Sequence, residues 1–161
     1  MKSDQERDKK FLERAIELSA AGMESGQGGP FGCIIVKGDK IVGEGNNKVT
    51  SSNDPTAHAE VVAIREACAK LGTHQLTDCD IYTSCEPCPM CLGAIYWARP
   101  RRVVYANTRE EAAAIEFDDE FIYNEISATM AERKIPFVHH PHPEAKAVFE
   151  AWKNWAGKIK Y

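Results

Sequence analysis

The chain contains two short stretches of distinctive chemistry, His58-Ala59-Glu60 and Pro87-Cys88-Pro89-Met90-Cys91. Cys88 and Cys91 stand three residues apart at a predicted helix start, so they fall on one face of its first turn. The free backbone N–H groups of that turn stabilise thiolates. His58 also lies at a predicted helix start. Because zinc in proteins prefers Cys and His ligands, the two helix starts together predict a zinc site with three protein ligands.

Around these two helix starts, the apolar pattern changes between helix and strand. Helical periodicity covers about 8–24, 57–71, 90–98 and 143–156, and apolar runs typical of strands cover 31–36, 41–45, 80–84, 103–106 and 135–138. Gly38-Asp39 lies between the first two strand runs and predicts a β-hairpin. Strands separated by helices predict an α/β domain with helices on both faces of the sheet, and the hairpin makes that sheet mixed.

The composition is that of an ordinary globular protein. The chain has 161 residues, 43% of them hydrophobic and 27% charged, and no internal repeat or linker, so we expect a single domain, 1–161. No apolar run reaches the roughly 18 residues of a membrane span. The charged stretch 1–10 lacks the apolar core of a signal peptide, which favours the cytoplasm. A net charge of −4 argues against nucleic acid as the partner.

Six cysteines are present, and three of them cluster as Cys85, Cys88 and Cys91. In a chain without export signals, such a cluster more often serves a metal or catalysis than disulfide bonds. The other three are interpreted as small buried hydrophobic residues. They are Cys33, Cys68 and Cys79.

The position of Glu60 is a geometric test of the predicted site. His58 and Glu60 are two residues apart, which separates them by about 200° on an ideal helix. They share a site only if His58 stands on the first, loosely wound turn. The competing interpretation is a structural site in which Cys85 is the fourth zinc ligand. A structural site, however, has no use for Glu60.

The two stretches, read as Pro55–Glu60 and Cys85–Cys91, resemble the cytidine and deoxycytidylate deaminase superfamily, whose signature combines His-x-Glu with Pro-Cys-x-x-Cys. The resemblance runs from the Gly28-Gly29-Pro30-Phe31-Gly32 turn over nearly the whole chain and is nearest to the small bacterial guanine deaminases. It implies a three-layer α/β/α fold with a central mixed five-stranded sheet.

The resemblance also implies a zinc site and a reaction. His58, Cys88 and Cys91 would bind one Zn²⁺ per subunit, with a water as the fourth ligand. The reaction would be hydrolysis of guanine to xanthine and ammonia. Glu60 would carry a proton from that water to the ring nitrogen beside the attacked carbon, and then help to protonate the leaving amine.

The choice of base depends on other residues that the resemblance places at the pocket. The Asn47 amide can donate to the acceptors of guanine, and the Asp119 carboxylate can accept from its paired donors. Phe31 and Trp97 would supply stacking walls, and Ala59 is a further expected substrate contact. The alternatives stay open. Asn47 can simply cap its turn, Asp119 can be a solvated acid at a helix start, and the two aromatic residues can belong to the core.

The tail, about 143–161, has two interpretations. It is either an amphipathic helix docked on the core or, as the guanine deaminases imply, a lid exchanged between the two subunits of a homodimer. In the second case Tyr161 would touch the substrate. Deleting the last residues separates the two, since loss of a lid should cripple turnover.

Rival functions share the zinc motif. They are a deaminase of cytosine, cytidine or guanosine, a tRNA adenosine deaminase, and a catalytically silent protein with a structural Cys₃His zinc site. The acidic charge favours a small-molecule base over a tRNA loop. His139, His140 and His142 are interpreted as a solvated loop, since no acid or cysteine accompanies them.

Overall fold

The computed structural model describes residues 2–161, with side chains from Asp4 onward; Met1, where the predicted domain begins, lies outside the described residues. The chain divides into two compact units, 1–119 and 120–161. In chain order the helices and strands are α1 (Lys2–Glu24), β1 (Gly32–Lys37), β2 (Lys40–Asn46), α2 (Val49–Ser52), α3 (Ala59–Leu71), β3 (Cys79–Cys85), α4 (Pro89–Ala98), β4 (Arg102–Asn107), α5 (Arg109–Ala113), α6 (Glu120–Ser127) and α7 (Pro143–Asn154).

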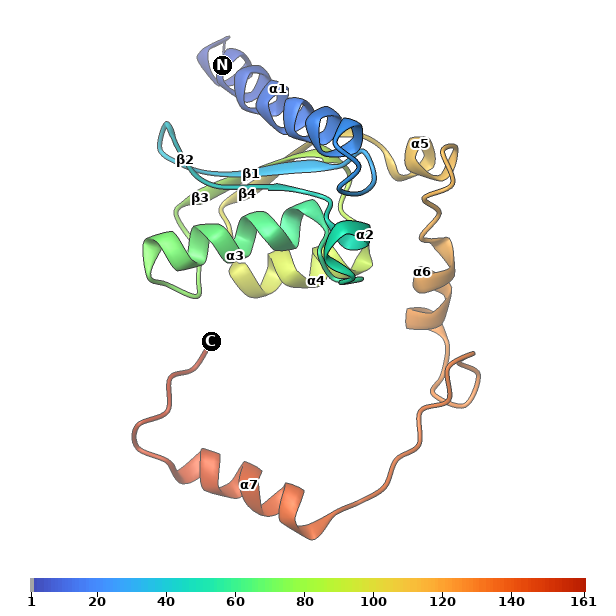
Figure 1. Ribbon diagram of the computed structural model, residues 1–161. Coiled ribbons are helices and arrows are strands. Elements are labelled where there is room, and N and C mark those ends of the chain that lie inside the picture. The colour runs from blue at the N-terminus through green and yellow to red at the C-terminus, as the bar shows by residue number, and fades with distance from the viewer. Residues whose placement is uncertain (1) are drawn as a thin grey trace. The chain divides into compact units, whose positions relative to one another are not determined.

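The strands of the first unit form a mixed sheet in the order β2-β1-β3-β4. β1 pairs antiparallel with β2 and with β3, whereas β3 and β4 are parallel. The parallel pair needs a crossover, and α4 supplies it. α1 lies on one face of the sheet, and α3 and α4 lie on the other (Figure 1). The predicted α/β/α layers and the mixed sheet are therefore confirmed.

Each face of the sheet carries its own core, because β1 is apolar on both sides. Cys33 and Ile35 pack with the alanines of α3, while Ile34 and Val36 pack with Phe11 of α1. This alternation follows from the two-residue period of a strand, and it places a strand buried on both faces at the centre of the sheet.

The close packing of α3 on β2 depends on glycine. A Cβ on Gly45 would lie 2.3 Å from the backbone oxygen of Ala59, and one on Gly43 would lie 2.4 Å from that of Ala63. Since Cβ atoms do not approach backbone oxygens so closely, neither position has room for a side chain. The first turn of α3 is thereby held directly against the sheet.

The predicted five-stranded sheet is wrong by one strand. Within the described residues the sheet has four strands, and the expected fifth, 135–138, is irregular and exposed. Pro136 lacks a backbone N–H and cannot donate to a ladder. The apolar residues of that segment are therefore left exposed.

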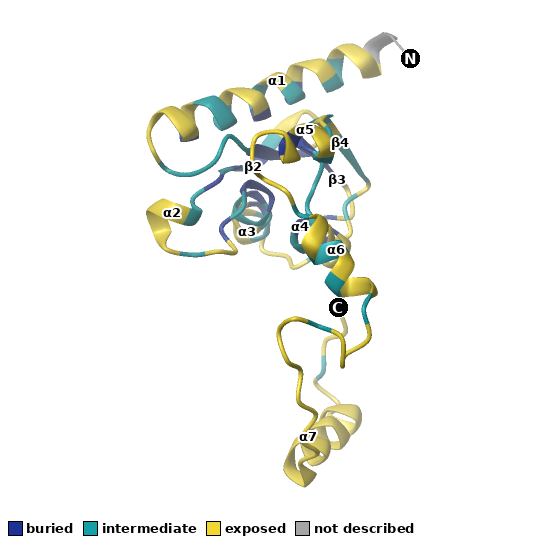
Figure 2. Ribbon diagram, turned by 90° about the vertical axis from the view of Figure 1, so that its right-hand side faces the viewer, coloured by how far each residue is buried: buried dark blue, intermediate teal, exposed yellow. Residues whose placement is uncertain are grey.

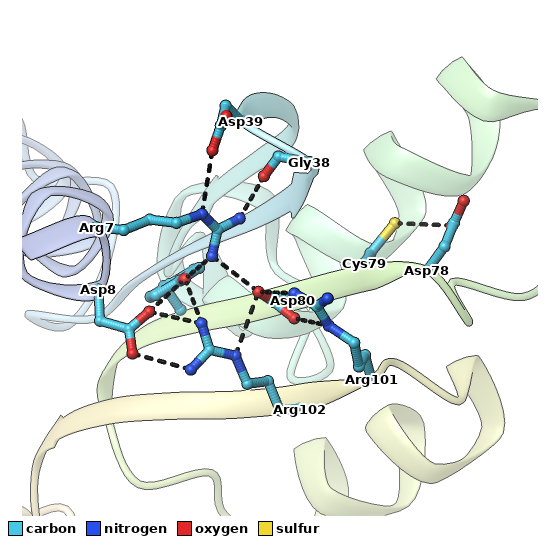
Figure 3. A network of polar contacts seen from close by, with 10 residues as sticks. Arg7, Asp8, Gly38, Asp39, Asp78, Cys79, Asp80, Arg101 and Arg102 are labelled. Carbon is cyan, nitrogen blue, oxygen red and sulfur yellow. Dashed lines mark hydrogen bonds and ion pairs between the residues drawn. The ribbon is translucent and has the colours of Figure 1, made fainter. Parts of the chain in front are cut away.

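Near the N-terminal end of β3, a cluster of charged side chains joins α1 to β3 and β4 (Figure 3). Asp80 is fully buried and accepts from Arg101 Nη2 at 2.7 Å and from Arg7 Nη1 at 3.0 Å. Arg102 donates to Asp8 at 2.6 Å. We call this set, together with Tyr82, the Asp80 network.

The second unit, 120–161, is described throughout, and none of its residues is buried. Its two helices, α6 and α7, are amphipathic, and yet they leave Phe121, Ile126, Phe149 and Trp152 exposed. Figure 2 shows α7 exposed along its whole length. In the described part of the chain, no helix has the length and apolar character that crossing a membrane requires.

Candidate active site

The candidate site lies beyond the C-terminal end of β3, where α3 and α4 begin. His58 is the N-cap of α3, with extended backbone angles (φ −69°, ψ 154°). Cys88 is the N-cap of α4 with a similar backbone, and Pro89 follows it in the first turn. Because His58 stands before the helix rather than on it, the 200° separation of an ideal helix does not apply. His58 and Glu60 can face the same site.

His58, Cys88 and Cys91 form the group of metal-ligating side chains that the described residues offer, with their ligand atoms within 4.8 Å of one another. The Nδ1 atom of His58 lies 3.5 Å from each sulfur. A tetrahedral zinc with Zn–N of about 2.0–2.1 Å and Zn–S of about 2.3 Å separates nitrogen from sulfur by about 3.6 Å. The three side chains therefore fit one zinc ion, with His58 ligating through Nδ1.

The two thiols differ in their proton affinity. A hydrogen bond from Cys91, assisted by His58, lowers the pKa of Cys88. The pKa of Cys91 is raised, first because its thiol donates that bond and then because it is buried. His58 has a raised pKa because of its contact with Cys88. A divalent cation favours the thiolate of both cysteines, so metal binding here releases protons.

Glu60 lies beside this group, in the first turn of α3, and is only 6% exposed. Its Oε2 is 3.3 Å from the sulfur of Cys91, and its Oε1 is 3.3 Å from the hydroxyl of Thr83. Burial raises the pKa of the Glu60 carboxyl above its ordinary value. A buried carboxyl beside a metal site is placed to accept a proton and to donate it again.

Cys85 is not part of the metal-ligating group. It ends β3, and its thiol donates to the backbone oxygen of Thr108 at 3.7 Å. The first cysteine of the Cys-x-x-Cys-x-x-Cys run therefore contacts the backbone of Thr108 and does not join the group that the other two form with His58. This arrangement disfavours a four-ligand structural site.

Asn47 and Phe31 lie side by side, because Phe31 precedes β1 and Asn47 follows its antiparallel partner β2. The backbone N–H of Asn47 donates to the oxygen of Phe31 at 3.0 Å, and the side-chain Oδ1 of Asn47 accepts from Val49 N at 3.1 Å. The amide oxygen is thus used by the loop, which leaves the NH₂ group as the donor that Asn47 can offer a ligand. The capping role and the substrate role predicted for Asn47 are compatible.

The segment 117–119 packs near the Phe31 turn. The ring of Phe117 contacts that of Phe31 edge-to-face, with centroids 4.9 Å apart. Two residues later, Asp119 has a raised pKa, because of partial burial and the negative charge of Cys88. The structure therefore brings Asp119 within electrostatic range of Cys88, a member of the metal group.

The remaining predicted contacts differ in their placement. Ala59 is fully buried in the first turn of α3. Trp97 lies on α4 and is 63% exposed, about 9 Å along the helix axis from Cys91. Tyr161 belongs to the second unit and is exposed there. The substrate contacts of Trp97 and Tyr161 stay predictions.

Two residues at the site had no role in the sequence-based prediction. Thr83 contacts Glu60, and Phe117 packs against Phe31. A hydroxyl inside an apolar strand is the one sequence signal for Thr83, and it is shared by many ordinary buried threonines.

Comparison with protein families and curated proteins agrees with this geometry. The model of the cytidine and deoxycytidylate deaminase zinc-binding region matches residues 5–107. The guanine deaminase of Bacillus subtilis (strain 168) is 58% identical over 151 residues, which cover 94% of this chain and 97% of that protein. The tRNA-specific adenosine deaminase of Aquifex aeolicus (strain VF5) is 32% identical over 135 residues, covering 84% and 86%.

Solved structures give the same result. An X-ray structure of guanine deaminase from Bacillus subtilis superposes with a TM-score of 0.92 at 57% identity, covering 95% of this chain and 98% of that chain. A structure of guanine deaminase from Nitrosomonas europaea has a TM-score of 0.64 at 34% identity, covering 68% of this chain and 63% of that chain.

Proposed function

The chain belongs to the cytidine and deoxycytidylate deaminase family with its zinc-binding region, and from this premise we propose that it is a guanine deaminase, which hydrolyses guanine to xanthine and ammonia. The observation that carries the proposal is the group of His58, Cys88 and Cys91 with the carboxyl of Glu60 beside it. The likeness to the Bacillus subtilis guanine deaminase, which extends over nearly the full length of both chains, supports guanine as the base.

In the proposed site, His58 Nδ1 and the sulfurs of Cys88 and Cys91 hold one Zn²⁺ per subunit. When bound, zinc supplies a Lewis acid that activates water at neutral pH. Glu60 accepts a proton from the attacking water and delivers it to the ring nitrogen beside the reacting carbon. The same carboxyl then helps to protonate the leaving amine. Its position supports this role, because the carboxyl is buried in the first turn of α3 with one oxygen 3.3 Å from the sulfur of Cys91.

Guanine presents two adjacent N–H donors on one edge and two acceptors, O6 and N7, on the other. We assign the acceptors to the NH₂ group of Asn47, whose oxygen is held by Val49 N, and the donors to the carboxylate of Asp119. Phe31, braced by Phe117, serves as one wall of the pocket. Ala59, Trp97 and Tyr161 complete the proposed contacts.

The second unit supports a homodimer in which the tail, 143–161, closes the site of the partner subunit. Its support is that none of residues 120–161 is fully buried, while many of their apolar side chains are exposed. A segment of this size cannot form a stable core alone and needs a surface to pack on. In this proposal the whole chain, 1–161, acts as one deaminase domain.

We also propose that the protein works in the cytoplasm. Its six cysteines, which all lie in the described part of the chain, are free thiols. A compartment that keeps thiols reduced preserves Cys88 and Cys91 as metal ligands.

An ammonia-release assay tests the proposed function. Zinc-loaded protein is given guanine, guanosine, adenine, cytosine and cytidine separately, and a tRNA substrate in parallel. We expect release from guanine, with loss on chelation and recovery on adding zinc. If ammonia were released only from one of the other substrates, that substrate would replace guanine in the proposal. If no substrate released ammonia, the protein would be a catalytically silent zinc protein.

The matched control for that assay is Glu60→Gln. Since Gln is close to Glu in size but cannot carry the proton, the variant should bind zinc normally and lose at least about 100-fold in kcat. Zinc content is measured by atomic absorption. Wild-type turnover in this variant would contradict the assignment of Glu60.

A further inference from the structure

We propose that Thr83 is a positioning residue for Glu60, whose hydroxyl holds one oxygen of the carboxyl so that the other oxygen faces the metal and carries the proton. The inference rests on the proposed function, since it concerns how the proton shuttle is oriented. Thr83 acts through Glu60, which its hydroxyl contacts.

The two oxygens of Glu60 have different neighbours. Oε1 accepts from the Thr83 hydroxyl at 3.3 Å, and Oε2 lies 3.3 Å from the sulfur of Cys91, one of the candidate metal ligands. A carboxyl can rotate by half a turn and exchange its oxygens. The hydrogen bond from Thr83 opposes that exchange, so the proton is kept on Oε2, the oxygen nearest the reacting atoms.

The hydroxyl of Thr83 is itself held in place by the sheet. Thr83 is 1% exposed and lies on β3, opposite Cys33 of β1 and Tyr105 of β4. β3 alternates its faces, so Thr83 shares with Ile81 the face that packs on α3. A threonine between two strands has little freedom about its first side-chain torsion. The hydroxyl therefore provides a fixed reference point for Glu60.

Thr83 has one proton to donate and two acceptors within reach. Glu60 Oε1 is at 3.3 Å, and the backbone oxygen of Gly32 is at 3.5 Å. A bond to an ionised carboxylate is stronger than one to a neutral carbonyl, so the hydroxyl favours Glu60 when that group is charged. The distance of 3.3 Å exceeds the usual 2.7–2.8 Å, and we expect it to shorten in the substrate complex, as catalytic hydrogen bonds do.

Paired substitutions at Thr83 test the proposal. Thr83→Val removes the hydroxyl and keeps the branched shape, whereas Thr83→Ser keeps the hydroxyl. We expect kcat for guanine to fall about 10- to 100-fold in the Val variant, the usual effect of losing a group that supports a catalytic side chain. KM and zinc content should stay within about twofold of the wild type, and the Ser variant should retain most of kcat.

Ser84→Ala is the matched control for general damage to β3. Ser84 is a buried hydroxyl on the same strand, but it accepts from the backbone N–H of Gly32 and does not contact Glu60. We expect this variant to lose stability and to retain kcat. If the Val variant does not fold, Thr83→Ala replaces it. Equal loss of kcat in the Val and Ser variants, or no loss in the Val variant, would overturn the proposal.

An infrared measurement separates this proposal from the proposed function. In zinc-loaded protein labelled with ¹³C-glutamate, the band of Glu60 is the one that Glu60→Gln removes. We expect that band to shift in Thr83→Val, because one oxygen has lost its hydrogen bond, and an unshifted band would overturn the Thr83 contact. A wild-type protein that releases no ammonia from guanine would instead refute the proposed substrate, while the band still decides the role of Thr83.

Discussion

Single residues at the site depend on backbone space as well as on side-chain chemistry. Gly28 lies against Asn47: a Cβ there would be 2.2 Å from the side-chain Oδ1 of Asn47 and 2.5 Å from its backbone oxygen. Both distances are shorter than any contact that a Cβ makes with a non-bonded atom. The orientation of the Asn47 amide, which we assign to the acceptor edge of the base, therefore requires glycine at position 28.

Gly28→Ala should displace the Asn47 amide and weaken substrate binding. Losing one hydrogen bond of about 1 to 1.5 kcal/mol corresponds to a fall in kcat/KM of about tenfold. We expect most of it as a higher KM for guanine, with zinc content unchanged, in steady-state kinetics. Gly93→Ala is the control, because a Cβ at Gly93 meets nothing within 4 Å. An unaltered KM in Gly28→Ala would argue against the Asn47 contact.

The chemistry of the metal group could be predicted from sequence, because His58, Cys88 and Cys91 stand at fixed short distances from helix starts. The orientation of Glu60 could not, since it depends on His58 being an N-cap with extended backbone. Thr83 was beyond prediction for a stronger reason. Which carboxyl a strand hydroxyl meets is decided by how β3 packs on α3, and no local pattern records that.

At the scale of elements, the Asp80 network (Figure 3) fastens α1 to the sheet near the start of β3, whereas the metal group lies beyond the end of that strand. Burial alone would raise the pKa of Asp80. Hydrogen bonds from Arg101 and Arg7, together with the charge of Arg102, outweigh burial and hold that pKa at about 2. The ordinary value in an unfolded chain is about 3.9. Folding therefore favours the ionised form of Asp80.

This difference predicts how stability depends on pH. A carboxyl with a lowered folded-state pKa stabilises the fold above about pH 4, and the contribution is lost as the pH falls through about 2. The contribution is on the order of 2–3 kcal/mol. Asp80→Asn should lower the free energy of unfolding in urea at pH 7 by at least this amount, and its deficit should shrink between pH 4 and pH 2.

Asp39→Asn is the control for the acid experiment. Asp39 also pairs with Arg7, at 3.1 Å, but its side chain is 89% exposed. Exposed ion pairs contribute little, so this variant should change stability by less than about 1 kcal/mol at any pH. Other groups that titrate in this pH range are the same in both variants, so their effect on the free energy of unfolding cancels when the two variants are compared. A deficit of Asp80→Asn that stays constant from pH 7 to pH 2 would contradict the assigned pKa.

Elements with a clear period were predictable, and those that depend on distant partners were not. β1, β2, β3 and β4 each lie within about two residues of an apolar run visible in the sequence. The expected strand at 135–138 shows the limit. The apolar run there predicts a strand, but in the described residues the segment is irregular and exposed, and Pro136 cannot donate to a strand ladder.

At the scale of the whole molecule, the two units contrast in how they treat apolar side chains. The first unit buries them on both faces of its sheet. The second exposes them along both helices, including Phe149 of α7 and Ile159 beyond it. Exposed apolar surface of this extent marks an interaction site in soluble proteins. The tail therefore needs a docking surface, and the proposal is that a second copy provides it over the active site.

Two inactive subunits test the exchange of the tail. One is truncated after His142 and keeps an intact metal group, and the other carries Glu60→Gln with an intact tail. Each alone should lose at least tenfold in kcat, since the first lacks the lid and the second lacks the proton shuttle. Co-expressed and purified together, they should regain activity, because the tail of the second subunit can close the site of the first. Light scattering should show a dimer for the mixture.

The outcomes of this experiment are distinct. Full activity of the truncated chain alone would show that the tail is not a lid. Loss of activity without recovery in a mixed dimer would show that each tail closes the site of its own subunit. Zinc content of the truncated chain should match the wild type, because His58, Cys88 and Cys91 all belong to the first unit. Recovery is expected only if the segment that closes the site and the residues that hold the metal come from different subunits.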